Sequence, residues 1–187
     1  MKKLLALVLA MVMVLSFAAC GNNEEPSEEN NAETVEVGSA LEILETVWGQ
    51  FGEDEKFFTM GGDYDNMVDS APGAVSNADF IANVLYVPAE EAANVSEAAS
   101  LVHGMNLNNF TCAAYKVSDA AAFAEAMKAS IAGVQWICGM PEKLVIATLG
   151  SEYAVVMFGV NDAVNPFEEK LVAAYPAAEI VTSEAIV

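Results

Sequence analysis

The sequence contains no arginine and a single histidine, His103. Without arginine, the chain lacks the planar guanidinium group that usually binds carboxylate and phosphate ligands. A single histidine excludes a metal site built from several histidines, and any histidine-dependent triad that does not use His103. His103 precedes a glycine at the end of an expected helix, where an exposed polar residue is ordinary. Histidine chemistry is therefore not expected.

Positive charge is also scarce, with 7 lysines against 27 acidic residues and a formal net charge of −20. Nucleic acid and anionic lipid headgroups would repel so acidic a chain. We therefore expect no nucleic-acid partner, and we interpret the acidity as a contribution to solubility.

The motifs of common enzyme classes are missing. The sequence has no nucleophile elbow, phosphate-binding loop, dinucleotide fingerprint or zincin helix. It has no Cys-x-x-Cys pair, and with only Cys112 and Cys138 beyond the N-terminal segment a structural zinc site would need several carboxylate ligands, which is an unusual set. The sequence therefore predicts no cofactor.

The N-terminus has the features of an export signal. Two lysines precede an apolar stretch, Leu4–Leu15, which is shorter than the roughly 20 residues of a membrane-spanning helix. The following Ser-Phe-Ala-Ala-Cys-Gly resembles the bacterial lipoprotein box, whose cysteine receives diacylglycerol and becomes the new N-terminus. We therefore expect residues 1–19 to be a signal peptide and Cys20 to carry lipid on the outer face of the cell membrane. The alternative is a plain secretory signal.

The residues after Cys20 predict a tether. Residues 20–37 are rich in Asn and Glu and contain hardly any bulky apolar side chain. Such a segment buries too little surface to offset its ordering entropy. We expect an acidic flexible tether here and one globular domain over residues 38–187.

The first half of the domain is weakly patterned. Ser39 to Glu42 fits a capping box, and Leu41, Leu44 and Trp48 follow at helical spacing. The expected elements are a helix from residue 39, no clear pattern over 57–75, helical spacing over 79–87 and a short helix over 96–103.

The second half predicts a strand over 109–117, a helix from Ser118, strands over 143–149 and 152–160, a helix capped by Asn165 and a strand over 179–187. A two-residue turn, Gly150-Ser151, separates the paired strands. This order predicts an α+β fold, in which an antiparallel sheet carries helices on one face in a ferredoxin-like arrangement.

The lipoprotein box, the strand FTCAAYKV, the segment Trp136-Ile137-Cys138 and the hairpin followed by a helix resemble small Firmicutes lipoproteins that carry a domain of unknown function. The resemblance covers residues 95–175 and the signal. It implies a cell-surface lipoprotein without an assigned activity.

Asp63, Asp65 and Asp69 form the one cluster with the character of a metal site. They offer the oxygen ligands that calcium prefers, at relative positions 1, 3 and 7. An EF-hand also needs glycine at position 6 and glutamate at position 12, where this chain has Val68 and Ala74. A solvated turn is the favoured interpretation, and a calcium site is the alternative.

Cys112 and Cys138 are the cysteines outside the anchor. Export permits a disulfide, and joining the two would stabilise the fold by about 3 kcal/mol on the chain-entropy estimate. The resembled family also places cysteine at both points. We favour the disulfide, and two free thiols acting as small hydrophobes are the alternative.

Both alternating faces of the hairpin, 144–149 with 154–158, are apolar, so each face needs a cover. Helices of the second half account for one face. Leu41, Leu44, Trp48, Phe57 and Phe58 are the candidates for the other face. The alternative is an open apolar face that binds a protein partner or forms a homodimer.

These observations favour a non-catalytic binding or interaction module, anchored to the membrane through Cys20. The alternative is a carboxylate-based or calcium-dependent hydrolase that uses Asp63, Asp65 and Asp69.

Overall fold

The computed structural model describes residues 37–187; the predicted signal peptide, Cys20 and residues 21–36 of the predicted tether lie outside them. The helices are α1 (Ala40–Trp48), α2 (Ala78–Asn83), α3 (Ala89–Ala92), η1 (a 3-10 turn, Leu107–Asn109), α4 (Ala120–Ala132) and α5 (Asn161–Ala174). The strands are β1 (Thr59–Gly61), β2 (Val68–Asp69), β3 (Gly73–Val75), β4 (Glu97–His103), β5 (Phe110–Lys116), β6 (Lys143–Leu149), β7 (Tyr153–Gly159) and β8 (Glu179–Ala185). None of these described helices is long and apolar enough to cross a membrane.

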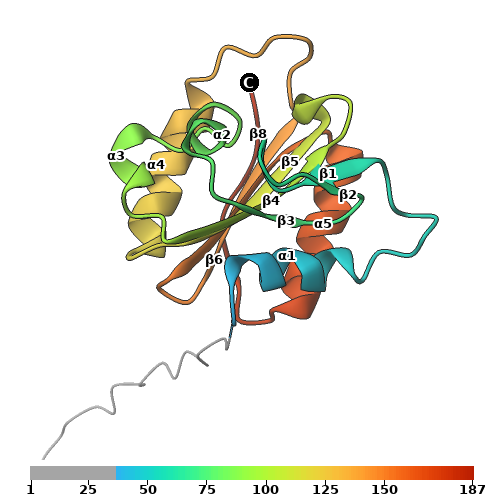
Figure 1. The fold of residues 1–187 in the computed structure, drawn as a ribbon, viewed down its shortest axis with the longest axis horizontal. Coiled ribbons are helices and arrows are strands. Elements are labelled where there is room, and N and C mark those ends of the chain that lie inside the picture. The colour runs from blue at the N-terminus through green and yellow to red at the C-terminus, as the bar shows by residue number, and fades with distance from the viewer. Residues whose placement is uncertain (1–36) are drawn as a thin grey trace, which may run out of the picture. The chain divides into compact units, whose positions relative to one another are not determined.

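The fold is α+β, with an open antiparallel sheet of eight strands and helices packed against it (Figure 1). The strand order is β2-β1-β4-β5-β7-β6-β8, and β3 also pairs with β4. The predicted class and the strand-helix-strand-strand-helix-strand order from β5 to β8 are confirmed.

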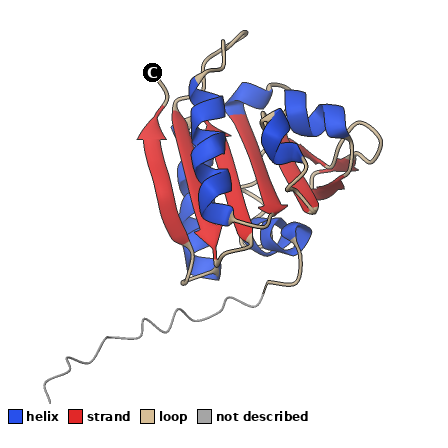
Figure 2. Ribbon diagram, turned by 90° about the vertical axis from the view of Figure 1, so that its left-hand side faces the viewer, coloured by secondary structure: helices blue, strands red, loops and turns tan. Residues whose placement is uncertain are grey.

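The helices cover both faces of the sheet, so the prediction of helices on one face is wrong. Figure 2 shows helices in front of the sheet and behind it. One core joins α1 and α5 to the sheet through side chains such as Leu44, Trp48 and Phe167. The other core joins α2 and α4 to the opposite face through Phe80 and Phe123.

The position of β8 explains this difference. α4 connects β5 to β6, and α5 connects β7 to β8; each connection passes over one intervening strand toward the same edge. Because β5 and β7 run in opposite directions, right-handed crossovers place α4 and α5 on opposite faces. In a ferredoxin-like sheet the last strand would pair with β5, but here β4 already occupies that edge of β5.

Local signals located several elements correctly. Ser39 caps α1, and its Oγ accepts a hydrogen bond from the Glu42 N–H (3.1 Å). α4 buries the predicted face, including Phe123, Met127 and Ile131. The hairpin is present, but its turn has three residues, 150–152, because Leu149 pairs with Tyr153.

The helix expected over residues 96–103 is instead strand β4. Five successive residues from Ala98 to Val102 are buried, because β4 is paired on both sides and covered on both faces. Burial on both faces removes the alternation by which a strand is recognised, so periodicity cannot separate it from a helix.

The last helix begins before its predicted cap at Asn165. α5 starts at Asn161, whose N–H donates to the Glu142 carboxylate (2.8 Å). Val164 is buried against the sheet, and this burial stabilises the additional first turn of α5. The predicted capping pair, Asn165 and Glu168, instead accepts hydrogen bonds from the Lys143 ammonium, at 2.8 and 2.6 Å.

Both apolar faces of the hairpin are covered within the chain. Val155 is 0% exposed on the α1 and α5 face, and Val156 is 3% exposed on the α4 face. Of the predicted covering residues, Leu44 and Trp48 are buried, whereas Phe58 is 51% exposed. The N-terminal part covers the second face as predicted, but it shares this face with α5, and no open face of the hairpin remains among the described residues.

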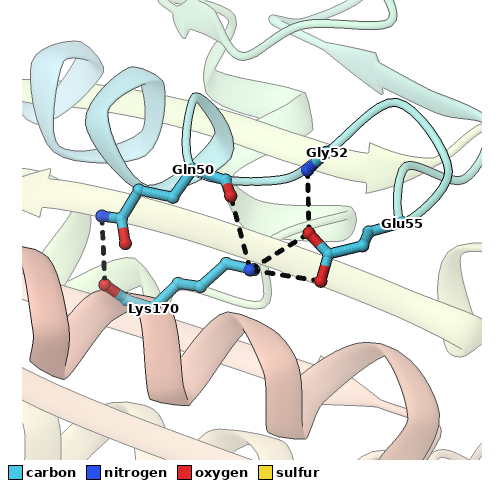
Figure 3. Close-up of polar contacts among 4 residues, drawn as sticks. All are labelled: Gln50, Gly52, Glu55 and Lys170. Atoms are coloured by element: carbon cyan, nitrogen blue, oxygen red, sulfur yellow. Dashed lines mark hydrogen bonds and ion pairs between the residues drawn. The ribbon is translucent and has the colours of Figure 1, made fainter.

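Lys170 on α5 holds the loop that follows α1 (Figure 3). Its ammonium donates to the Gln50 carbonyl (3.4 Å) and to both oxygens of the Glu55 carboxylate (3.2 and 3.4 Å). The same ammonium lies 4.7 Å from the centre of the Phe51 ring. Gly52 N–H also donates to Glu55 (2.8 Å). Lys170 therefore links α5 to the loop that follows α1, and these two helices cover the same face of the sheet.

Candidate binding site

An interruption in the edge of the sheet builds the site. β1 pairs with residues 101–103 of β4, and β3 pairs with residues 98–100 of the same strand. β1 and β3 therefore occupy successive halves of one edge of β4. The chain between them, residues 62–72, leaves the edge of β4 and contains β2, which pairs with the other side of β1. We call residues 62–72 the edge insertion.

Glycines allow the two ends of the edge insertion to cross closely. A Cβ on Gly61 would collide with the backbone of Gly73, and one on Gly73 would collide with Gly62. Gly62 also has φ +78°, in the left-handed region that glycine adopts without strain. The Ser100 hydroxyl donates to the Gly62 carbonyl (2.6 Å), which fixes this crossing to the sheet.

Asp63 organises the turn that follows. The residue is 1% exposed. It accepts hydrogen bonds from four backbone N–H groups at 2.6–3.0 Å: Asp65, Asn66, Ser76 and Asn77. Burial raises the pKa of Asp63, but these N–H groups lower it more, to about 2. The ionised carboxylate thus joins the edge insertion to the start of α2.

A pocket of about 220 Å³ opens beside this turn. The edge insertion forms one wall, α2 a second and the end of β4 with η1 a third. The lining is mainly apolar and consists of Met60, Gly61, Gly62, Asp63, Tyr64, Met67, Phe80, Val84, Val102, His103, Gly104 and Leu107. We call this cavity the edge pocket.

Three apolar side chains of the edge pocket also reach solvent. Tyr64 is 61% exposed, Met67 is 68% exposed and Leu107 is 39% exposed. The Tyr64 ring stands edge-on to Phe80, with centroids 5.1 Å apart. Isolated exposed apolar residues are common, but several around one apolar pocket are typical of a binding site.

Two uncharged loops continue the apolar surface from Leu107. The Asn106 and Asn108 side-chain amides donate to three successive carbonyls, at residues 137, 138 and 139, over 2.7–3.1 Å. These bonds hold Ile137 at 78% exposure beside the loop that carries Met105, which is 84% exposed. Residues 104–109 and 134–141 contain no charged side chain.

His103 has a structural role at the pocket. Its Nδ1 accepts hydrogen bonds from the backbone N–H groups of Met105 (3.1 Å) and Asn106 (3.3 Å). Its ring stacks on Phe57, with centroids 5.9 Å apart. Among the described residues no carboxylate bonds to this imidazole, so the orienting partner of a catalytic histidine is not in place.

The structure does not bring Asp63, Asp65 and Asp69 together as metal ligands. The Asp63 oxygens are taken by the N–H groups described above, Asp65 accepts from the Asn77 amide (2.8 Å), and Asp69 accepts from a neighbouring serine hydroxyl (3.1 Å). Within residues 37–187 no group of three or more His, Cys, Asp or Glu side chains is placed to hold a metal ion. The cluster is a turn, and the geometry lends no support to the calcium alternative.

Cys112 and Cys138 are both free cysteines, so the favoured disulfide is not formed in the structure. Cys112 is buried on the face of β5 that α1 and α5 cover. Cys138 is exposed, and the adjacent Trp136 fixes its loop on the opposite face by packing against Phe158. The sheet therefore separates the two thiols.

The rest of the described surface has a net negative charge. All five lysines within residues 37–187 form an ion pair with a glutamate: Lys56, Lys116, Lys128, Lys143 and Lys170. Acidic residues remain in large excess over these cations. The edge insertion itself carries three aspartates and no lysine.

The edge pocket was not predicted from the sequence. Its lining comes from three separate segments of the chain, represented by Met67, Phe80 and Leu107, which belong to no recognisable motif. The available signal was the pair of glycine-containing turns around residues 61–62 and 72–73, which marks a close approach of two backbones.

Comparisons with models of protein families, with curated proteins and with solved structures found no match to this chain. The resemblance to small Firmicutes lipoproteins remains a prediction.

Proposed function

We propose that this chain is an exported lipoprotein, anchored to the outer face of the cell membrane through Cys20. We propose further that its domain is a non-catalytic binding module, with the edge pocket as its binding site. The observation that carries the proposal is the edge pocket itself, apolar inside and bordered by the exposed side chains of Tyr64, Met67 and Leu107.

The construction of the pocket supports this proposal. The edge insertion is held by a buried carboxylate and by backbone crossings that only glycine allows, so its exposed side chains are presented from a defined framework. Preorganised apolar pockets lose little conformational entropy when a ligand binds. The hydrolase alternative is not retained, because no observation in the described residues favours it.

The anchoring part is tested by the Cys20→Ser substitution. The variant should be found in the soluble fraction or remain unprocessed, because serine has no sulfur to receive diacylglycerol. Mass spectrometry of the mature native protein should find lipid on residue 20 at its N-terminus. An unmodified Cys20 inside the mature chain would contradict this proposal.

The binding part is tested with indole, a small uncharged aromatic probe. Titration should shift the methyl NMR signals of Met60 and Met67, which line the edge pocket, and leave that of Met127 in the α4 core unchanged. Tyr64→Ala and Leu107→Ala should weaken the response, because both remove apolar surface from the rim. Equal shifts at all three methionines would mean non-specific binding.

A further inference from the structure

We infer that the edge pocket takes one apolar side chain of a basic peptide segment in a partner protein, with lysine or arginine beside that side chain. This inference rests on the proposed function and specifies the partner of the same site. Three observations carry it: the volume of the pocket, the charge around it and the exposed ring at its rim.

The volume of the pocket favours a single side chain over a whole small molecule as its occupant. At about 220 Å³ it is smaller than the roughly 300–1,000 Å³ typical of pockets that enclose whole small molecules. Protein interfaces, in contrast, concentrate binding energy in small pockets that receive single aromatic or aliphatic anchors. Exposed Met67 and Leu107 provide further apolar contact beyond the pocket.

The charge around the pocket selects a basic partner. Asp65 and Asp69 are exposed on the edge insertion, and Asp79 is exposed on α2 next to Phe80 of the lining. Every lysine of the described chain is already paired with a glutamate, so no unpaired lysine there would repel a cationic segment. The formal charge of −20 also attracts basic chains over longer distances and repels a second copy of this protein.

The ring of Tyr64 adds a contact suited to a cation. It is 61% exposed at the rim, and its edge-on contact with Phe80 fixes its orientation. A lysine or arginine beside the inserted side chain can lie over the face of such a ring while it pairs with a neighbouring aspartate.

Three peptides test the inference. Each has a central phenylalanine, flanked on both sides by lysine in the first, glutamine in the second and glutamate in the third. Binding is measured from the methyl signals of Met60 and Met67. We expect the lysine peptide to bind about tenfold more tightly than the glutamine peptide, and the glutamate peptide more weakly still. The difference should shrink in 0.5 M NaCl, because salt screens exposed charges.

Matched variants assign the effect to the pocket. Asp65→Asn with Asp69→Asn should weaken the lysine peptide about fivefold and leave the glutamine peptide unchanged. Glu90→Gln with Glu125→Gln removes the same charge from exposed positions on α3 and α4, and should change neither peptide. A lysine peptide with alanine in place of phenylalanine should bind far more weakly, because nothing fills the pocket.

Other outcomes separate this inference from the proposed function. Equal binding of the lysine and glutamine peptides would overturn the inference and leave the pocket as an apolar site. If phenethylamine bound as tightly as the lysine peptide, the occupant would be a small cation and the peptide assignment would fail. A dimer that Leu107→Asp dissociates would assign the pocket to a second copy and overturn the inference. If neither indole nor any peptide bound, the proposed function would fail as well.

Discussion

Asp63 is the residue on which the edge insertion depends. Four backbone N–H groups donate to its buried carboxylate, and they belong to two segments, the edge insertion and the start of α2. A calcium ligand needs free oxygen lone pairs, whereas these oxygens are already used within the protein. These hydrogen bonds occupy the oxygens that a metal would need, and they also stabilise the folded protein.

The first prediction concerns the pH dependence of this carboxylate. Its pKa falls from an ordinary 3.8 to about 2 in the folded protein. Because the folded pKa is the lower one, the stabilisation is complete above the ordinary value and is lost as the pH falls from about 4 to about 2. The loss should be on the order of 2 kcal/mol in the free energy of unfolding, measured by urea titration.

Asp63→Asn should flatten this part of the pH profile and lower stability at pH 7, because a neutral amide is a weaker acceptor. Asp54→Asn, at an exposed position, is the control and should behave like the unmodified protein. The same slope in Asp63→Asn and the unmodified protein would show that other groups cause the acid sensitivity.

The second prediction at this scale concerns the two thiols. In the Cys20→Ser variant, Cys138 should react with iodoacetamide in the native protein because its side chain is exposed. Cys112 should react only after unfolding, because it is 0% exposed and burial raises its thiol pKa. Peptide mass spectrometry should find one modified cysteine before denaturation and two after it. A cross-linked peptide pair in unreduced protein would instead support the disulfide.

At the scale of elements, the central hairpin is the part of the fold with the least tolerance for polar groups. Every residue of β7 is buried, since α1 and α5 cover one face of the sheet and α4 covers the other. An open face on this hairpin was the alternative considered from the sequence, and it would expose either Val155 or Val156, which point to opposite faces. The covering of both faces leads to a different expectation for these valines.

The third prediction follows from this burial. Val155→Lys should lower the free energy of unfolding by about 3 kcal/mol or more, because no acceptor awaits an ammonium group in the core. Val181→Lys is the matched control on edge strand β8, where the valine is 43% exposed, and it should cost little. Urea unfolding monitored by circular dichroism gives both values. A Val155→Lys variant that stayed fully stable while a dimer dissociated would restore the open-face hypothesis.

For the whole molecule, the dominant property is excess negative charge. The formal net charge is −20, and the five ion pairs of the described residues are mostly exposed at the surface. Exposed pairs each contribute only about 0–1 kcal/mol, whereas repulsion acts among all the unpaired carboxylates.

The fourth prediction is therefore that sodium chloride stabilises the domain. Raising its concentration from 0.02 to 0.5 M should raise the Tm, because the screening length falls well below about 10 Å and repulsion among carboxylates weakens. Sodium chloride is preferred to sulfate, which strengthens apolar burial by a separate mechanism. A Tm that fell with salt would show that the ion pairs outweigh the repulsion.

Local sequence signals determined the elements whose evidence is contained in neighbouring residues. The Ser39 cap, the apolar stripe of α4 and the two apolar runs on either side of the Gly150-Ser151 turn specify their elements without reference to the rest of the chain. Each depends on hydrogen bonds or side-chain directions within a few residues, which composition and spacing report directly. The acidity was visible from composition, and the lack of recognisable catalytic motifs was visible from the order of residues.

Only the tertiary structure decided the remaining features. Residues 97–103 form a strand because other strands pair with them on both sides. The face on which α5 lies depends on the pairing of β8 with β6, since β4 occupies the edge of β5 that would otherwise be free. The edge pocket, the saturation of Asp63 and the separation of Cys112 from Cys138 likewise arise from contacts between segments distant in sequence. Spacing along a chain does not encode distances in space, because packing of the whole domain selects which distant segments meet.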